Sequence, residues 1–250
     1  HDAAHYRLYR RRWLNELVGR SAGAIVGISM CTYRVVHRLH HNHLYSAQDP
    51  DIPLFGGYPR GKRYLLRKLA TDLMGLTAPK TYRYFFGLPI GNEKAHKKNR
   101  PLDDTSASMQ KTARVDRWMV AGVQLLMLLS AVAAGLWIEY FVLWLLPAIT
   151  VLQGILRFRA ICEHGAATDP KSPLRAARTN FAPWWLRWWL FPHHVNFHLE
   201  HHLYPSIPHY NLPRCHAELI KIGVLRGAEI KPLSATLGRI FANPVQALAD

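Results

Sequence analysis

Eight histidines fall into three clusters whose internal spacing is typical of metal ligands. The clusters are HDAAH at residues 1–5, HRLHH at 37–41 and HLEHH at 198–202. In a helix, residues three or four positions apart lie on one face, so each cluster can direct its imidazoles the same way. A site with several metal ions requires many such ligands. The candidate ligands are His1, His5, His37, His40, His41, His198, His201 and His202.

Two alternatives bear on these clusters. Histidine is abundant, at 15 of 250 residues, so single pairs arise by chance, but a threefold repeat of ligand spacing argues against chance. Imidazole also suits iron, zinc, copper and nickel alike, so the residues alone do not name the metal.

A long apolar run separates the second cluster from the third. Residues 118–158 carry only two formal charges, Glu139 and Arg157, and are twice as long as the roughly 20 residues that cross a bilayer once. We predict two membrane spans, about 118–136 and 140–157, with a turn between Gly135 and Tyr140. Lysine and arginine flank the outer ends but not the turn, which places both outer ends in the cytoplasm. A buried helical hairpin of a soluble protein is the alternative.

The remaining elements are expected to position the clusters. We predict a surface helix over residues 6–20, a partly embedded helix over 21–36 and an irregular loop over 46–63. An even number of crossings returns the chain to one side of the membrane, so all three clusters can meet there. The predicted fold is all-α: one domain over residues 1–250, an integral membrane helical bundle with a cytoplasmic helical cap that carries a histidine-rich dimetal site. Because the chain starts on a candidate ligand rather than methionine, we expect an N-terminal segment to be missing.

Charge and composition narrow the partners. The formal net charge of +16 lies beside the spans and no nucleic-acid recognition module is visible, which excludes nucleic acid and favours anionic lipid or an acidic protein. Residues 183–192 (PWWLRWWLFP) predict an interfacial anchor. The three cysteines form no disulfide framework. The basic residues expected to dock an acidic partner or lipid are Arg60, Lys62, Arg63, Arg67 and Lys68.

The three clusters, in this order and separated by a two-span hairpin, resemble the histidine boxes of membrane fatty acid desaturases and related hydroxylases. The continuation HLYPSIPHYNLP is similar to acyl-lipid members, and the resemblance covers residues 1 to about 220. It implies two non-haem iron ions that use O₂ to remove hydrogen from a lipid acyl chain. It also implies a ninth ligand, His164. Ala160 and the short HxxxH first box depart from the acyl-CoA type of desaturase.

Further roles follow from the site. The resemblance implies external electrons, and because no haem motif or iron–sulfur cysteine set is visible, we expect a separate donor of the ferredoxin or cytochrome b5 type. Carboxylates and amides beside ligands are candidates to orient them: Asn196, Glu200, Glu163 and Asp2. The histidines that we treat as non-ligands are His43, His96, His193, His194, His209 and His216.

Two other functions stay open. The same scaffold as a hydroxylase or ketolase, acting on a carotenoid or sphingolipid, carries the same boxes. A non-catalytic membrane protein that transports or binds metal is the rival of another class, although transporters place polar ligands within their spans.

Overall fold

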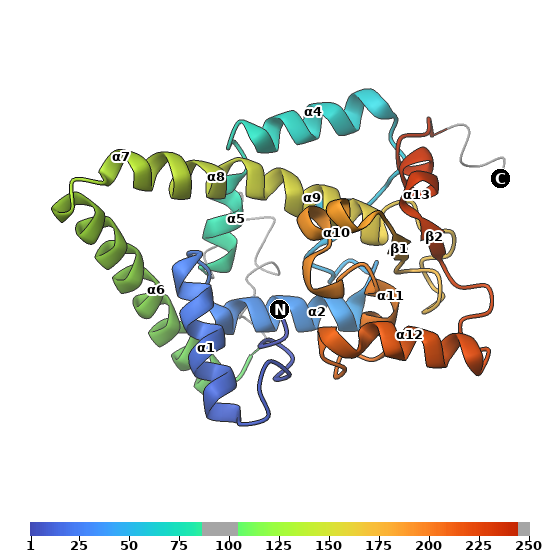
Figure 1. Cartoon of the computed structure of the whole chain (residues 1–250), viewed down its shortest axis with the longest axis horizontal. Coiled ribbons are helices and arrows are strands. Elements are labelled where there is room, and N and C mark those ends of the chain that lie inside the picture. Colours follow the sequence, from blue (N-terminus) through green and yellow to red (C-terminus); the bar gives the residue numbers. More distant parts are fainter. Residues whose placement is uncertain (87–104, 245–250) are drawn as a thin grey trace. The chain divides into compact units, whose positions relative to one another are not determined.

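The computed structural model describes residues 1–86 and 105–244. This part of the chain is mostly helical and divides into two compact units (Figure 1). Of the described residues, unit 1 comprises 1–39, 71–86 and 105–153, and unit 2 comprises 40–70 and 154–244. His96 lies outside the described residues.

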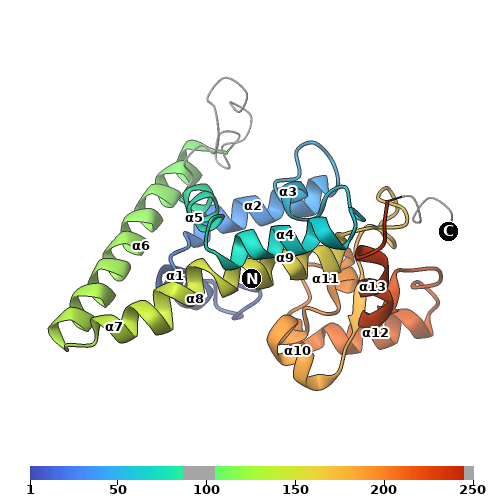
Figure 2. The same cartoon turned by 90° about the horizontal axis from the view of Figure 1, so that it is seen from above.

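Unit 1 contains the apolar helices. Its elements are α1 (Arg12–Ile25), the first part of α2 (Met30–His43), α5 (Ala78–Phe85), α6 (Ala107–Ala133), α7 (Trp137–Tyr140), a π-helical segment (Phe141–Leu145) and α8 (Leu146–Ile149). The Ser106 hydroxyl accepts a hydrogen bond from the Met109 N–H and caps the start of α6. At the other end Gly135 adopts φ +73°, a conformation that glycine takes at little cost, and α6 and α7 meet there at a corner (Figure 2).

A buried carboxylate joins the helices of unit 1. Asp116 on α6 is fully buried. It accepts hydrogen bonds from Arg20 Nε at 2.8 Å, Ser29 Oγ at 2.8 Å and the Cys31 N–H at 2.9 Å. Three donors, one of them charged, compensate for burying the carboxylate, so α1 and the start of α2 are fixed to α6.

Two helical stretches are long and apolar enough to cross a membrane. They run from Ala107 to Ala133 and from Trp137 to His164, and 11% of the apolar window of each is buried. Leu126 is 64% exposed and Leu143 is 72% exposed. The core helix of a soluble protein buries most such side chains, whereas the described residues cover little of these two helices. The first helix begins before the predicted span of 118–136 but ends short of it at Ala133, and the second extends beyond the predicted span of 140–157 at both ends.

The N-terminal helices differ from the sequence prediction. The predicted helices over 6–20 and 21–36 are instead α1, which begins at Arg12 and ends at Ile25, and α2, which begins at Met30 and continues through the second histidine cluster to His43. The apolar run from 21 to 36 is therefore interrupted. Gly27, with φ +79°, lies in the turn between the two helices.

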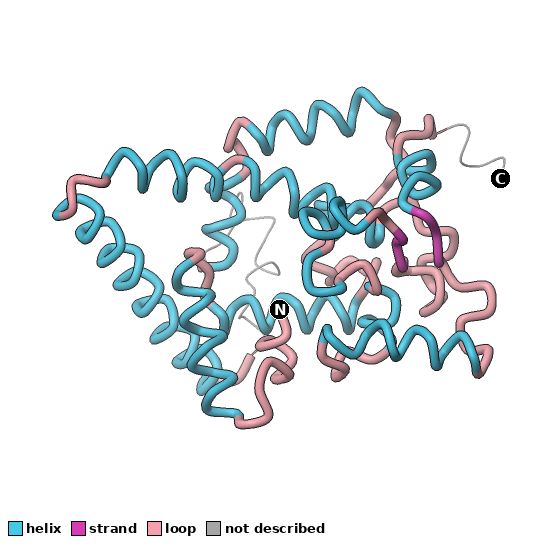
Figure 3. The backbone as a smooth tube through the Cα atoms, in the orientation of Figure 1, coloured by secondary structure: helices cyan, strands magenta, loops and turns pink. Residues whose placement is uncertain are grey.

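Unit 2 combines short helices with one small sheet. Its elements are the end of α2, α3 (Ile52–Phe55), α4 (Lys62–Leu73), α9 (Val151–His164), β1 (Thr179–Phe181), α10 (Trp184–Leu190), α11 (His198–Leu203), α12 (Leu212–Lys221), β2 (Ile230–Pro232) and α13 (Leu233–Ile240). The strands pair in parallel, with Thr179 opposite Ile230 (Figure 3). Helix α3 is one turn within the segment predicted as an irregular loop.

The core of unit 2 packs beside the last turns of α9. Buried Phe55, Leu65, Ile161, Phe191 and Ile240 form one cluster. Burying each such side chain contributes about 1.5–3 kcal/mol. This cluster fixes the end of α9, and therefore the backbone from which His164 projects.

Candidate metal centre

Four histidines of unit 2 direct their Nε2 atoms at one another. His40 comes from α2, His164 from the last residue of α9, and His198 and His202 from successive turns of α11. The Nε2 of His164 lies 3.2 Å from that of His40 and 2.8 Å from that of His198, and the Nε2 atoms of His198 and His202 are 3.1 Å apart. The sequence separates His40 from the other three by more than 120 positions, and the fold of unit 2 gathers them.

Acceptors on the far side of two rings set their tautomers. The Nδ1 of His40 lies 2.9 Å from Asp49 Oδ1, and the Nδ1 of His164 lies 3.0 Å from the carbonyl oxygen of Ala176. Both partners only accept, so each Nδ1 carries the hydrogen and each neutral ring presents a lone pair at Nε2. The lone pairs point at one another, an arrangement that is favourable only with a cation or a proton between them.

The spacing of these nitrogens fits a shared metal ion. Nitrogens at adjacent positions of one ion, each bound at 2.0–2.1 Å, are about 2.8–3.0 Å apart in octahedral geometry and about 3.3–3.4 Å apart in tetrahedral geometry. The observed separations of 2.8–3.2 Å are close to these values. The group of His40, His164, His198 and His202 is therefore able to hold a metal ion, and imidazole nitrogen is a suitable ligand for iron.

Burial favours the neutral imidazoles that metal binding requires. Burial, with added repulsion from neighbouring histidines, holds the pKa of His198 and of His202 well below the usual value. Burial also lowers the pKa of His40, but the hydrogen bond to Asp49 and the charge of Asp51 outweigh it and raise that pKa overall. Metal ligands must be unprotonated, so the rings of His198 and His202 are ready to bind a metal ion at neutral pH. At His40, the carboxylates of Asp49 and Asp51 compensate for positive charge.

The end of α9 is held by groups that follow it in sequence. Buried Arg178 donates from Nη1 to the carbonyl oxygen of Cys162 at 3.0 Å and from Nη2 to that of Gly165 at 3.1 Å. Asn180 Nδ2 donates to the Cys162 oxygen at 3.0 Å, and the Tyr45 hydroxyl donates to the His164 carbonyl oxygen. These donors satisfy carbonyls that a helix end leaves without partners, and they fix the orientation of His164.

Two further histidines of unit 2 also direct their Nε2 atoms at each other. The Nε2 atoms of His41 on α2 and His201 on α11 are 2.9 Å apart. The ring of His41 also stacks on that of His202, with centroids 4.2 Å apart. Six of the nine predicted ligands therefore lie in unit 2: His40, His41, His164, His198, His201 and His202.

Unit 1 gathers the remaining three predicted ligands. The ligand atoms of His1, His5 and His37 lie within 4.8 Å of one another. Burial lowers the pKa of His5 to about 4, which keeps it neutral. Arg34 holds the N-terminal segment by donating to the carbonyl oxygens of Ala3 and Ala4 at 3.1 and 3.2 Å. The Asp2 carboxylate lies 3.3 Å from His1 Nδ1.

The predicted orienting residues of unit 2 occupy different positions. Glu163 is buried, with Oε2 3.8 Å from His198 Nε2. Glu200 is fully buried and accepts hydrogen bonds from Thr179 Oγ1 at 2.5 Å and His216 Nδ1 at 2.6 Å. Within the part of the chain that the structure describes, the buried amide of Asn196 has no side-chain hydrogen-bond partner.

Sequence reasoning missed several residues that position the histidines. Asp49 lies in a turn eight residues beyond the second box, and a carboxylate just after a histidine box was the available signal. Arg178 and Thr179 gave no signal in the sequence. His216 was set aside as a non-ligand, and the structure shows it bound to Glu200.

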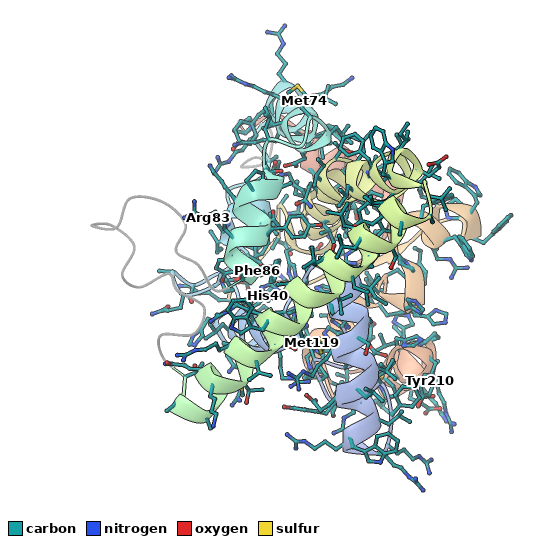
Figure 4. All side chains as sticks on the ribbon, turned by 90° about the vertical axis from the view of Figure 1, so that its left-hand side faces the viewer. His40, Met74, Arg83, Phe86, Met119 and Tyr210 are labelled. Atoms are coloured by element: carbon teal, nitrogen blue, oxygen red, sulfur yellow. The ribbon has the colours of Figure 1, made fainter. Side chains whose placement is uncertain are left out.

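The other histidines treated as non-ligands lie elsewhere. His43 is exposed at the end of α2, and His193 and His194 are exposed after α10. The ring of His209 packs against that of His193, with centroids 4.8 Å apart. The next residue, Tyr210, points outward and is 62% exposed (Figure 4).

Comparison with known families identifies the histidine pattern. The family model described as fatty acid desaturase matches residues 1–230. The chain belongs to the fatty acid desaturase family. The match includes all nine predicted ligands and both apolar helices, so the clustered histidines of unit 2 are a feature of a desaturase-family chain.

Two curated relatives also match this desaturase-family chain. The sn-1 oleoyl-lipid 12-desaturase of Synechocystis sp. is 24% identical over 237 residues, which cover 88% of this chain and 62% of the relative. The dihydrorhizobitoxine desaturase of Bradyrhizobium elkanii is 26% identical over 223 residues, which cover 83% and 59%. The chain therefore spans about three fifths of the length of each relative.

Proposed function

We propose that this chain carries the metal site of a membrane-bound, O₂-dependent desaturase that introduces a double bond into a lipid acyl chain. The observation that carries the proposal is the convergence of four imidazole Nε2 atoms in unit 2 of a chain that matches the fatty acid desaturase family. The name of the Synechocystis relative supports an acyl-lipid substrate.

The nine predicted histidines are proposed to hold two iron ions. When bound, iron supplies the activation of O₂ and the oxidising power that removes hydrogen from an unactivated methylene. In unit 2, His40, His164, His198 and His202 are one proposed set of ligands, and His41 and His201 belong to the same proposal. The assignment of His1, His5 and His37 to the centre stays a prediction.

The protein's own groups orient and shield this set. Asp49 and the Ala176 carbonyl oxygen fix the His40 and His164 rings, which keeps both Nε2 lone pairs directed at the ion. Phe55 packs on His164, with centroids 4.8 Å apart, and restricts water on that side. Glu163 lies where a carboxylate stabilises positive charge near His198.

Membrane insertion and electron supply complete the proposal. The two apolar helices are proposed to cross the bilayer as a hairpin, with a helical cap and the histidines on the cytoplasmic side in a single functional domain. Their exposed apolar side chains support this arrangement. Electrons are proposed to come from a separate ferredoxin or cytochrome b5 type of donor.

Product analysis tests this function. The chain is expressed with an electron donor in a lipid-producing bacterial host, and fatty acids, polar lipids and carotenoids are profiled by mass spectrometry. We expect a product lighter than its substrate by two hydrogen atoms, and about two iron ions per chain in the purified protein.

Other products distinguish the alternatives. A product heavier by one oxygen atom identifies a hydroxylase, and a new carbonyl identifies a ketolase. An unchanged lipid profile from an iron-free protein would support the metal-binding or transport alternative. The His202→Ala variant, which removes a proposed ligand, serves as the inactive control, and His43→Ala serves as its matched active control.

A further inference from the structure

A basic pocket lies close to the histidine group of unit 2. It has a volume of about 350 Å³ and is bordered by three cationic side chains, Arg60, Lys68 and Arg157, together with Tyr45, Tyr58 and Tyr64. No carboxylate is among the described residues that line it. A pocket of this size accommodates a small ligand group, and its charge favours an anion.

Two of the cations converge on one aromatic ring. The Arg60 guanidinium lies 5.1 Å from the centroid of the Tyr64 ring, and Lys68 Nζ lies 5.7 Å from the same centroid. Arg60 Nη1 also donates to the Tyr64 hydroxyl at 3.0 Å. Among the described residues neither cation forms an ion pair with a carboxylate, so both charges are available to an anion.

The backbone is shaped to admit Arg60. Its Nε donates to the carbonyl oxygen of Gly57 at 3.1 Å. Gly57 has φ +73°, and a Cβ at this position would lie 2.3 Å from Arg60 Nη2. A side chain at this position would displace the guanidinium, so glycine permits the close approach of Arg60 at the edge of the pocket.

The pocket is connected to the proposed metal ligands through unit 2. The Tyr45 hydroxyl donates to the His164 carbonyl oxygen, and the Tyr45 ring packs on Phe55, with centroids 5.1 Å apart. Arg157 precedes His164 by seven residues on α9, about 10 Å along the helix. A ligand held by the cations would extend past Tyr45 toward the histidines.

We propose that this pocket binds the phosphate ester of the substrate's headgroup, an assignment that rests on the proposed function. Arginine forms paired hydrogen bonds to phosphate oxygens, and lysine and tyrosine add a charge and further donors. Anchoring the headgroup fixes which part of the acyl chain reaches the metal site, so the pocket sets the position of the double bond.

Calorimetry on the purified chain in detergent tests this assignment. The probes are dihexanoyl phosphatidylglycerol, dihexanoylglycerol, which has the same acyl chains without phosphate, and inorganic phosphate. We expect the phosphatidylglycerol to bind most tightly. The double variant R60Q/K68Q should weaken that binding about tenfold or more, because two charge-assisted contacts are lost.

A matched variant separates the pocket from general charge. K221Q/R226Q removes the same charge from exposed positions of unit 2 that do not line the pocket, and should leave binding within about twofold. An equal loss of phosphatidylglycerol affinity in both double variants overturns the assignment. So does dihexanoylglycerol that binds as tightly as the phosphatidylglycerol. If inorganic phosphate binds as tightly as the lipid, the pocket is a site for free phosphate rather than for a lipid headgroup.

The two proposals fail separately. Binding is measured without turnover, so a chain that binds phosphatidylglycerol through Arg60 and Lys68 but forms no double bond contradicts the proposed function alone. The other outcome is that the chain desaturates lipid, and that R60Q/K68Q binds the lipid and places the double bond just as the unmodified chain does. That outcome contradicts the headgroup assignment alone.

Discussion

At the scale of the residue, the hydrogen bond at the other ring nitrogen decides whether a histidine can serve as a metal ligand. His40 presents its Nε2 lone pair because Asp49 accepts from its Nδ1. Asp51 lies nearby, but its Oδ2 is 3.7 Å from the same Nδ1 and makes no hydrogen bond to it. Two carboxylates two positions apart in sequence therefore differ in what they do for one ring.

Replacing Asp49 should weaken metal binding without removing a ligand. In Asp49→Asn the amide can donate to Nδ1, which favours the tautomer with its hydrogen on Nε2. We expect metal affinity to fall about 10- to 100-fold. Titration of the metal-free protein with Co²⁺, followed by its visible absorption, measures the affinity directly.

The matched control is Asp51→Asn, which loses the same charge. It should reduce Co²⁺ affinity much less, because it breaks no hydrogen bond to His40. Equal losses in the two variants would show that the charge near the site matters rather than the orientation of the ring.

At the scale of the element, the end of α9 depends on one buried arginine. Arg178 is 2% exposed and connects the last carbonyls of α9 to Glu229, with Nε 3.0 Å from Oε2. Burial raises the pKa of Glu229, but the hydrogen bond from Thr168 and the charge of Arg178 outweigh burial and lower it. The carboxylate is therefore ionised at neutral pH and needs its cationic partner.

Removing this arginine should destabilise unit 2. Arg178→Met leaves the Glu229 carboxylate with one fewer cation and several helix-end carbonyls without donors, at a cost of about 3–5 kcal/mol. We expect a clear fall in the Tm of the detergent-solubilised protein.

Arg175 offers the comparison. It is exposed, and its Nε donates to the carbonyl oxygen of Gly227 at 3.2 Å. Arg175→Met should cost about 1 kcal/mol or less, because water replaces the lost contact. A Tm that falls equally in both variants contradicts the role given to Arg178.

At the scale of the whole molecule, the position of the membrane is the principal prediction. If α6 and the helix from Trp137 to His164 cross the bilayer, Ser108 and Lys171 lie on one side and Glu139 on the other. Single cysteines at these three positions, in a chain whose three native cysteines are replaced, report this arrangement.

Labelling with a membrane-impermeant maleimide in intact cells gives the readout. We expect label at Glu139→Cys only, and label at Ser108→Cys and Lys171→Cys after the cells are opened. Label at all three positions in intact cells, or at none after opening, would falsify the two-span hairpin.

Much of the helical structure and the family were accessible from the sequence. Ligand spacing and hydropathy are local properties, so the HxxHH runs indicated histidines on one helix face and the apolar run indicated two long helices. The break between α1 and α2 was predicted at residues 20 and 21, several residues before its position at Gly27, because an apolar run does not by itself show where a helix within it ends. Helix α3 was missed for a related reason: a single turn is stabilised by packing, here through Phe55, rather than by its own pattern.

The sequence by itself determined which residues are able to bind metal. The tertiary structure decided which of them meet within unit 2, because convergence depends on contacts between segments more than 120 residues apart. It also decided the hydrogen bonds of Asp49, Ala176 and Arg178, because these contacts depend on how the segments after α2 and α9 fold back against those helices. Ligand identity is a property of side-chain chemistry, whereas the direction of a lone pair is a property of the packed fold.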